Sequence, residues 1–275
     1  MTLRGGQVSW GTRTYVMAIV NVTPDSFSGD GVVDSNIATE RAIVQWNAGA
    51  DLIDVGGEST RPGHRPVDAS VEIARIVPVI EALRERLPQA PISVDTYKPS
   101  VARRAYAAGA DLVNSVWGAS NELLELVAEL GVPIVAMHNQ RGTSYEGSVV
   151  DAVLRFLAEC AQRAAAHGIP RERVILDPGI GFGKTAEQSI AVLRNLDRIV
   201  ALGFPTMVGT SRKSMIGKLT GRTPQERAYG TVATTALAVK AGVDIVRVHD
   251  VAAARDAVAV ADAVVRGWRP PAWTE

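Results

Sequence analysis

The stretch Ala48-Gly49-Ala50-Asp51-Leu52-Ile53-Asp54 recurs twice along the chain with the same layout, as Ala108–Asn114 and as Ala241–Arg247. In each copy the glycine suits the left-handed position just past the end of a helix, and the apolar pair begins a strand. The last residue of each copy is polar: Asp54, Asn114 and Arg247. Equivalent positions on three strands would aim these side chains at one place.

Short apolar runs alternate with helical patterns along the whole sequence. The runs are rich in β-branched residues, which favours buried parallel strands over fragments of helix. Eight such units in a single chain predict a closed (β/α)₈ barrel, a TIM barrel of the α/β class, rather than an open sheet. We expect one domain over residues 1–275, with strands at Tyr15–Val20, Leu52–Val55, Ile92–Val94, Leu112–Val113, Ile134–Met137, Val174–Leu176, Thr206–Val208 and Ile245–Val248.

Polar side chains or glycines stand where most of these runs end. Such positions form the carboxyl-terminal rim of a barrel, where active sites are built. Packing alone does not explain why buried strands end repeatedly in such residues. The rim residues of this kind, besides those of the repeated stretch, are Asn21, Asp95, His138, Asp177 and Gly209.

Composition excludes several classes of protein. Lys+Arg 29 balances Asp+Glu 29, which argues against a general nucleic-acid binder. No run of about 18 apolar residues predicts a membrane span, and Met1–Trp10 has no apolar core of a secretory signal. The single cysteine, Cys160, lies in an Ala-rich helical pattern and is expected to be a packed thiol. We expect a reduced, cytoplasmic enzyme that acts on small molecules.

Two loops near the amino terminus have the composition of mobile substrate loops. In residues 21–31, Phe27 stands among polar and glycine residues, which favours a lid over a plain surface turn. In residues 54–63, Arg61 lies within a glycine-rich segment and could reach a phosphate oxygen.

The loops after the sixth and seventh strands suggest a polar ligand. Asp177 precedes three glycines at alternate positions, and its carboxylate could accept two N–H donors from the edge of a planar ligand. Lys213 lies between a buried strand and the start of a helix, which favours function over a solvated surface charge. Ser214 at that helix start could bind an anion such as a carboxylate.

The end of the eighth strand carries Arg247 and His249. Positions two apart along a strand face the same side, so the pair could form a clamp for an oxyanion. The sequence shows no metal-ligand spacing of His or Cys, and any metal would be a Mg²⁺ shared with substrate phosphates and bound by Asn21.

Taken together, these segments resemble the dihydropteroate synthase family. The resemblance spans nearly the whole chain, in the order of the family, at Asn21–Ser28, Asp54–Gly63, Ser93–Lys98, Met137-His138, Asp177–Lys184, Ser211–Gly217 and Arg247–Val251. It implies a pterin-binding barrel of folate biosynthesis that joins a pterin diphosphate to para-aminobenzoate. It also implies Mg²⁺ dependence, a homodimer and inhibition by sulfonamides.

The resemblance assigns a role to each matching residue. The diphosphate would be bound by Asn21, Arg61, Arg247 and His249, with Arg247, His249, Lys213 and Asp30 as the catalytic set. The pterin would be bound by Asp95, Asn114, Asp177 and Lys213 and lined by Met137, Phe182 and Gly209. The para-aminobenzoate pocket would consist of Thr60, Pro62, Phe27 and Ser214.

The chain departs from the family pattern at two places. Ser115 stands where the family commonly has an aspartate, and Asp30 is shifted by one position in the first loop. Two alternatives therefore stay open: a methyltransferase that binds methyltetrahydrofolate in a similar barrel, and a non-catalytic paralogue that binds a pterin without turnover.

Overall fold

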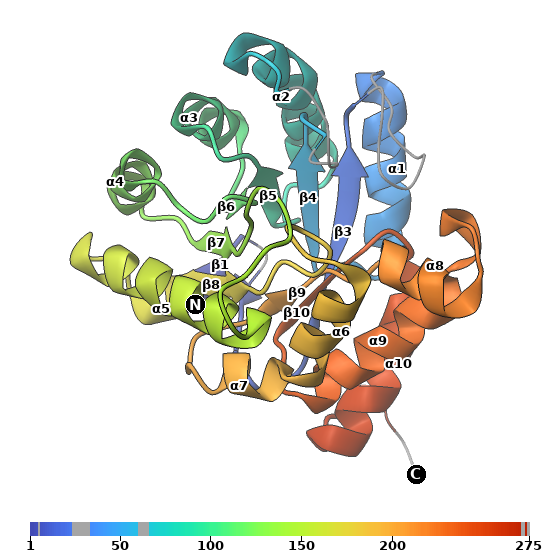
Figure 1. Cartoon of the computed structure of the whole chain (residues 1–275). Helices are drawn as coiled ribbons and strands as arrows, with labels where there is room; N and C mark the ends of the chain where they lie inside the picture. The colour runs from blue at the N-terminus through green and yellow to red at the C-terminus, as the bar shows by residue number, and fades with distance from the viewer. Residues whose placement is uncertain (5, 24–33, 60–65, 271–272, 274–275) are drawn as a thin grey trace.

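Eight parallel strands form one sheet in the computed structural model, which describes residues 1–4, 6–23, 34–59, 66–270 and 273 (Figure 1). Their order is β8-β7-β6-β5-β4-β3-β10-β9, and a parallel bridge between Leu176 and Thr206 joins the two outer strands. The sheet therefore closes into the predicted barrel. The strands are β3 (Tyr15–Asn21), β4 (Leu52–Gly56), β5 (Ile92–Asp95), β6 (Leu112–Ser115), β7 (Ile134–Met137), β8 (Val174–Asp177), β9 (Met207–Val208) and β10 (Ile245–Val248).

All eight predicted strands are confirmed, with one systematic difference at their ends. Several strands include the polar residue that the sequence pattern placed just after them, such as Asn21, Asp95 and Asp177. These side chains are consequently held by the hydrogen-bonded sheet itself, which fixes them more firmly than a loop would.

Helices surround the sheet and connect successive strands (Figure 1). They are α1 (Ser35–Asn47), α2 (Ala69–Arg86), α3 (Pro99–Ala108), α4 (Asn121–Leu130), α5 (Val149–Ala166), α6 (Ala186–Arg194), α7 (Leu196–Val200), α8 (Ser214–Thr220), α9 (Ala228–Lys240) and α10 (Val251–Val265), with 3₁₀ turns at Arg171–Arg173 and Pro224–Glu226. In the described part of the chain no helix is long and apolar enough to cross a bilayer.

The repeated stretch has the geometry that the sequence predicted. Gly49, Gly109 and Gly242 have φ angles of 97°, 116° and 94°, in the region where residues with a side chain are strained. Each glycine ends a helix and turns the chain into the next strand, namely β4, β6 or β10. The left-handed turns are therefore confirmed in all three copies.

The aspartate of each copy holds the neighbouring strand. Asp51 accepts a hydrogen bond from the backbone N–H of Val16 at 2.8 Å, and Asp111 accepts one from Ile92 at 2.9 Å. Asp244 accepts one from Thr206 at 3.0 Å. Each carboxylate thus caps the start of the strand that precedes its own in the chain. The motif thus helps to fix the register of these paired strands at the amino-terminal end of the barrel.

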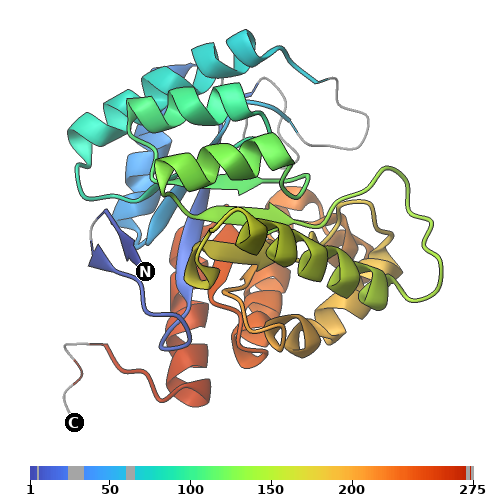
Figure 2. The ribbon, with the colours of Figure 1, turned by 90° about the vertical axis from the view of Figure 1, so that its left-hand side faces the viewer.

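The barrel interior is apolar at that same end. Met17, Leu52, Ile175 and Ile245 form its inner layer with their neighbours, and all are buried. The hairpin of β1 (Thr2–Leu3) and β2 (Gly6–Gln7) packs Leu3 against this layer and closes the amino-terminal end of the barrel (Figure 2). The polar interior therefore lies toward the carboxyl ends of the strands.

Candidate active site

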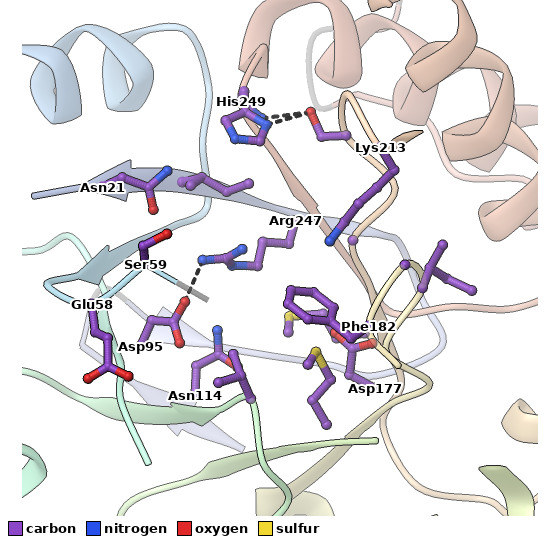
Figure 3. Close-up of a pocket in the computed structure, with 18 of the residues that line it drawn as sticks. Asn21, Glu58, Ser59, Asp95, Asn114, Asp177, Phe182, Lys213, Arg247 and His249 are labelled. Carbon is purple, nitrogen blue, oxygen red and sulfur yellow. Dashed lines mark hydrogen bonds and ion pairs between the residues drawn. The ribbon is translucent and has the colours of Figure 1, made fainter. Parts of the chain in front are cut away.

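The polar ends of the repeated stretch meet inside the barrel. Asn114 Nδ2 donates to Asp54 Oδ2 at 2.9 Å, and Arg247 Nε donates to the same oxygen at 2.6 Å. Arg247 Nη2 also donates to Asp95 Oδ2 at 2.9 Å (Figure 3). One guanidinium thus bridges two carboxylates from the neighbouring strands β4 and β5, in which Asp54 pairs with Ser93 and Asp95 lies two residues further along.

Burial makes this network electrostatically strong. Removal from water raises the pKa of Asp95, and the Asp54 carboxylate raises it further, while Arg247 opposes the shift. Burial also disfavours the charge on Arg247, but Asp54 and Asp95 outweigh it and hold the pKa of Arg247 above its ordinary value. The arginine is therefore always charged. Together with Asp54, Asp95 and Asn114 it forms the polar layer that we call the barrel floor.

A cavity of about 200 Å³ lies above this floor, at the carboxyl ends of the strands. Figure 3 shows Arg247 and Lys213 above Phe182 in the view, with Asp95, Asn114 and Asp177 below. Every described residue that the sequence assigned to substrate or metal lines this one cavity. They are Asn21, Asp95, Asn114, Met137, Asp177, Phe182, Gly209, Lys213, Ser214, Arg247 and His249.

The remaining assigned residues are Phe27, Asp30, Thr60, Arg61 and Pro62, and they lie outside the described residues. Their roles stay predictions. Residues 23 and 59, which precede the two undescribed segments, do line the cavity.

Glycines shape the wall formed by the loop after β8. A Cβ atom on Gly179 would lie 1.9 Å from the carbonyl oxygen of His138, and one on Gly183 would lie 2.7 Å from that of Gln140. Both glycines also have positive φ angles, of 66° and 57°. Close approach to the β7 loop therefore requires glycine here, which accounts for two of the three alternate glycines that follow Asp177.

Lys184 holds this glycine loop from within. Its ammonium group donates to the carbonyl oxygens of Gly179 at 2.9 Å and Phe182 at 3.0 Å, and it lies 2.8 Å from His138 Nδ1. Burial lowers the pKa of Lys184 to about 7. Burial and the neighbouring Lys184 lower the pKa of His138 to about 3, so the imidazole is neutral and serves as a structural acceptor.

Asp177, at the end of β8, and Lys213, in the loop after β9, face the cavity. Asp177 Oδ1 accepts from Gly179 N at 2.7 Å, and burial raises the pKa of Asp177 to about 6. Lys213 Nζ lies 3.8 Å from the centre of the Phe182 ring, in a cation–π contact. Burial and the positive charge of Arg247 lower the pKa of Lys213 to about 7. The pair offers a planar ligand one carboxylate acceptor and one ammonium donor.

The opposite wall contains His249 and Ser211. The backbone N–H of His249 donates to Ser211 Oγ at 3.1 Å, and His249 Nδ1 lies 2.9 Å from the same oxygen (Figure 3). The ring is thus held at the mouth of the cavity near Asn21, as Figure 3 shows.

Several residues of the site were missed by the sequence reasoning. Asp54 is fully buried and organises Arg247 and Asn114; the repeated stretch pointed to it, but it was given no role. Ser211 and Lys184 belonged to recognised segments without an assignment. Glu58 lines the cavity and is tied to Lys98 Nζ at 2.5 Å, a contact across 40 residues of sequence that no local pattern indicates.

Ser115, the first departure from the family pattern, lies away from the cavity. It follows Asn114 on β6, so the alternation of the strand turns it to the opposite face. Its side chain is buried, and its hydroxyl has no hydrogen-bond partner among the described residues. The serine therefore changes the packing behind the barrel rather than the cavity wall.

The oxygen donors of the cavity decide which metal ion it could hold. Within the described residues no group of three or more His, Cys, Asp or Glu side chains could hold a metal ion. Asn21 nevertheless presents an amide oxygen at the cavity mouth, of the hard kind that Mg²⁺ prefers. The donor set suits a Mg²⁺ that keeps most of its ligands from water and substrate, as magnesium commonly does.

The side chains that line the cavity define a class of ligand. Asp95 and Asp177 supply acceptors, Asn114 and Lys213 supply donors, and Phe182 and Met137 give flat apolar walls. Such a slot suits a planar heterocycle with several N–H donors, and the Arg247 and His249 side would accept an anionic substituent.

Comparisons with known proteins agree with this class. Residues 17–249 match the family described as pterin binding enzyme. A dihydropteroate synthase of Clostridium beijerinckii is 45% identical over 270 residues, which cover 97% of this chain and 100% of the relative. A solved structure of the Clostridium difficile dihydropteroate synthase, obtained in the presence of pteroic acid, has a TM-score of 0.89 at 44% identity and covers 94% of this chain and 100% of that one.

A third relative is described as an inactive dihydropteroate synthase 2, from Mycobacterium tuberculosis. It is 42% identical over 287 residues, covering 99% of this chain and 89% of the relative. The fold and the cavity define a pterin-binding barrel enzyme. The chain belongs to the dihydropteroate synthase family.

Proposed function

We propose that this chain catalyses the dihydropteroate synthase reaction. In that reaction 6-hydroxymethyl-7,8-dihydropterin diphosphate and para-aminobenzoate give 7,8-dihydropteroate and pyrophosphate. The observation that supports the proposal is that Asp177, Arg247 and Ser214, which we expect to bind the pterin, the diphosphate and para-aminobenzoate, line one cavity.

The cavity suits a pterin ring lying over the barrel floor. Asp177 and Asp95 would accept hydrogen bonds from ring N–H groups, while Asn114 and Lys213 would donate to ring acceptors. Each of these four groups projects from the end of a strand or from the loop after it. The ring would therefore be held at a fixed depth, with its substituted edge toward Arg247 and His249.

Chemistry at this site needs no covalent enzyme intermediate. The bond between the pterin methylene carbon and the diphosphate oxygen breaks, and the electron-rich ring shares the positive charge that develops on carbon. The amine of para-aminobenzoate forms the new C–N bond and then loses a proton. Arg247 and His249 would stabilise the negative charge that grows on the departing diphosphate.

We also propose that Mg²⁺ takes part, with Asn21 as the protein ligand that the described residues offer. When bound, the ion would neutralise part of the diphosphate charge. Titration of Mg²⁺ into the enzyme with pyrophosphate, comparing the wild type with Asn21→Ala, tests this assignment by calorimetry. An unchanged apparent Kd in the variant would remove Asn21 from the metal site.

A homodimer is proposed from the surface of α9 and α10. Tyr229 and Leu237 on α9 are 89% and 62% exposed, and Val260 and Val264 on α10 are 68% and 80% exposed. These two helices pack against each other, and exposed apolar residues of this kind on adjacent helices are typical of a protein–protein interface. Light scattering after size exclusion should give twice the mass of one chain, and Leu237→Glu should give a monomer.

We propose further that the chain acts as one domain in the cytoplasm. A single sheet runs from β3 to β10, so strands from both ends of the chain pair directly. Limited proteolysis should give no stable half, and cell fractionation should recover the protein with cytoplasmic markers.

One experiment separates the proposed reaction from its alternatives. Pyrophosphate release should require both para-aminobenzoate and the pterin diphosphate. A pterin-binding protein without turnover would bind the pterin but release no pyrophosphate. A methyltransferase would bind methyltetrahydrofolate, and para-aminobenzoate would have no effect on its activity.

A further inference from the structure

Two loops that carry site residues are joined by two side-chain interactions, a hydrogen bond and an ion pair. Ser211 is tied to His249, and the next residues along both loops, Arg212 and Asp250, form a two-pronged ion pair. Arg212 Nη2 lies 2.7 Å from Asp250 Oδ1, and Arg212 Nε lies 3.1 Å from Asp250 Oδ2. We call these four residues the loop clasp.

Arg212 occupies an unusual backbone conformation. Its φ angle is 57°, the only positive value at a residue other than glycine in the described part of the chain. Such a conformation costs free energy and persists only when its surroundings fix it. Here the Arg212 N–H donates to Thr231 Oγ1 at 3.1 Å, and Arg227 Nη1 donates to the Arg212 carbonyl at 2.9 Å.

The left-handed turn at Arg212 determines where Lys213 goes. The chain runs outward from β9 and reverses at Arg212, so that Lys213 extends back over Gly181 and Phe182 into the cavity. Ser214 then begins α8. A relaxed, right-handed Arg212 would send both residues in other directions.

The ion pair itself does not face the substrate. Among the described residues, Arg212 and Asp250 line a second cavity, of about 520 Å³, on the far side of Asn21 and His249, and neither lines the substrate cavity. Their side chains are only 17% and 32% exposed, so the pair is better shielded than an ordinary surface salt bridge. The arginine therefore bears on the reaction through its neighbours.

We propose that the Arg212–Asp250 pair is a positioning device that fixes Lys213 relative to His249, and through them the pterin relative to its diphosphate. The proposal rests on the reaction proposed above. Arg212 and Asp250 are positioning residues, and the sequence stretch Ser211-Arg212-Lys213 is then a functional unit in which the middle residue aims the two beside it.

Asp250→Asn removes the negative charge of Asp250 and keeps the shape of its side chain. We expect kcat for pyrophosphate release to fall by about tenfold or more, since small misplacements of reacting groups have effects of this order. Arg212→Gly provides a second test, because glycine accepts the left-handed turn without strain while the whole arginine side chain, and with it the ion pair, is removed. It should show the same loss.

Two readouts separate positioning from general destabilisation. The pH dependence of kcat should shift upward in both variants, because Lys213 becomes better hydrated and its lowered pKa returns toward the ordinary value. Exchanging the partners, Arg212→Asp with Asp250→Arg, should recover part of the activity, since aspartate tolerates a left-handed φ. Glu129→Gln breaks the exposed Arg103–Glu129 pair and is the matched control, with no change expected.

The result that would overturn the proposal is a wild-type kcat and pH profile in either single variant. Loss of activity that only follows the unfolded fraction, with no rescue by the exchange, would overturn it equally. If the wild type releases no pyrophosphate, the proposed reaction fails, and hydrogen exchange of residues 209–216 still tests the clasp. Exchange there should be faster in Asp250→Asn than in the wild type, and equal rates would refute the clasp.

Discussion

Arg247 and Asp54 stand 193 residues apart in the sequence, and their Nε and Oδ2 atoms lie 2.6 Å apart in the barrel. Asp54 is fully buried and Arg247 is 17% exposed. Loss of the Asp54 charge leaves the buried Arg247 guanidinium with Asp95 as its one remaining ion-pair partner among the described residues, which is more costly than losing an exposed salt bridge.

Asp54→Asn should therefore lower the free energy of unfolding by about 3 kcal/mol, measured by urea denaturation. Asp151→Asn breaks the exposed Arg198–Asp151 pair and should change it by less than about 1 kcal/mol. Equal effects of the two substitutions would mean that the Asp54 network does not support the barrel.

Asp177→Asn tests the acceptor edge of the pterin slot. The substitution keeps the shape but places an amide N–H against a ring N–H, so a buried donor loses its partner. Pterin affinity should fall by about 2–4 kcal/mol in calorimetry. Unchanged binding would remove Asp177 from the pterin slot.

Arg247 is best tested with two replacements, because it serves both the barrel floor and the proposed diphosphate site. Arg247→Ala should lower kcat by roughly a hundredfold or more, on the scale of losing one oxyanion donor. Arg247→Lys keeps a positive charge between Asp54 and Asp95 but loses the two-pronged contact, and should recover only part of the rate.

A pterin without the diphosphate separates the two roles of Arg247. Its binding should be nearly normal in Arg247→Lys, where the carboxylates stay paired. If its affinity falls as far as kcat does in that variant, the arginine belongs to the ring pocket rather than to the leaving group.

Gly179→Ala and Gly142→Ala form a matched pair. Both glycines have positive φ angles, 66° and 77°, but an added Cβ meets the His138 carbonyl at Gly179 and nothing within 4 Å at Gly142. Gly142→Ala should cost only the backbone strain, about 1 kcal/mol. Gly179→Ala should cost clearly more in thermal unfolding and abolish pterin binding, and equal melting temperatures would contradict this account of the loop.

Pterin affinity and stability of the free protein should respond to pH in opposite directions near Asp177. Ionised Asp177 is the better acceptor, so affinity should fall as pH drops through about 6, the folded-state pKa. Because that pKa is raised from 3.8, the stability contribution of Asp177 is full below about 4 and is lost as pH rises through about 6. Calorimetry and urea denaturation between pH 5 and 7 check the two trends, and the Asp177→Asn variant should lack both.

The sequence predicted the barrel well because its signal is repetitive and local. Apolar runs of strand length and glycines at helix ends follow from short-range rules, and Gly49, Gly109 and Gly242 obey them. Site residues at strand ends were predictable for the same reason, since Asp95 and Asp177 had to reach the rim once the strands were assigned.

What the sequence did not predict depends on contacts between distant loops. The partner of Arg247 is set by how the barrel closes, and the positive φ of Arg212 follows from contacts with Asp250, Thr231 and Arg227. No propensity of arginine predicts such a turn. Lys184 illustrates the same point. From its position in a rim loop it could be taken for a ligand-binding cation, but in the structure its ammonium group contacts His138.

The pairing of β3 with β10 has a consequence for how the chain is made. Tyr15 to Ala18 pair with Ile245 to Val248, so one edge of β3 has no partner until nearly the whole chain has left the ribosome. The apolar layer that Leu3 of the hairpin covers is likewise incomplete until Ile245 has been synthesised. An unpaired apolar edge is a template for aggregation. Nascent chains that stall before Ile245 should therefore depend on chaperones, and the full chain should not.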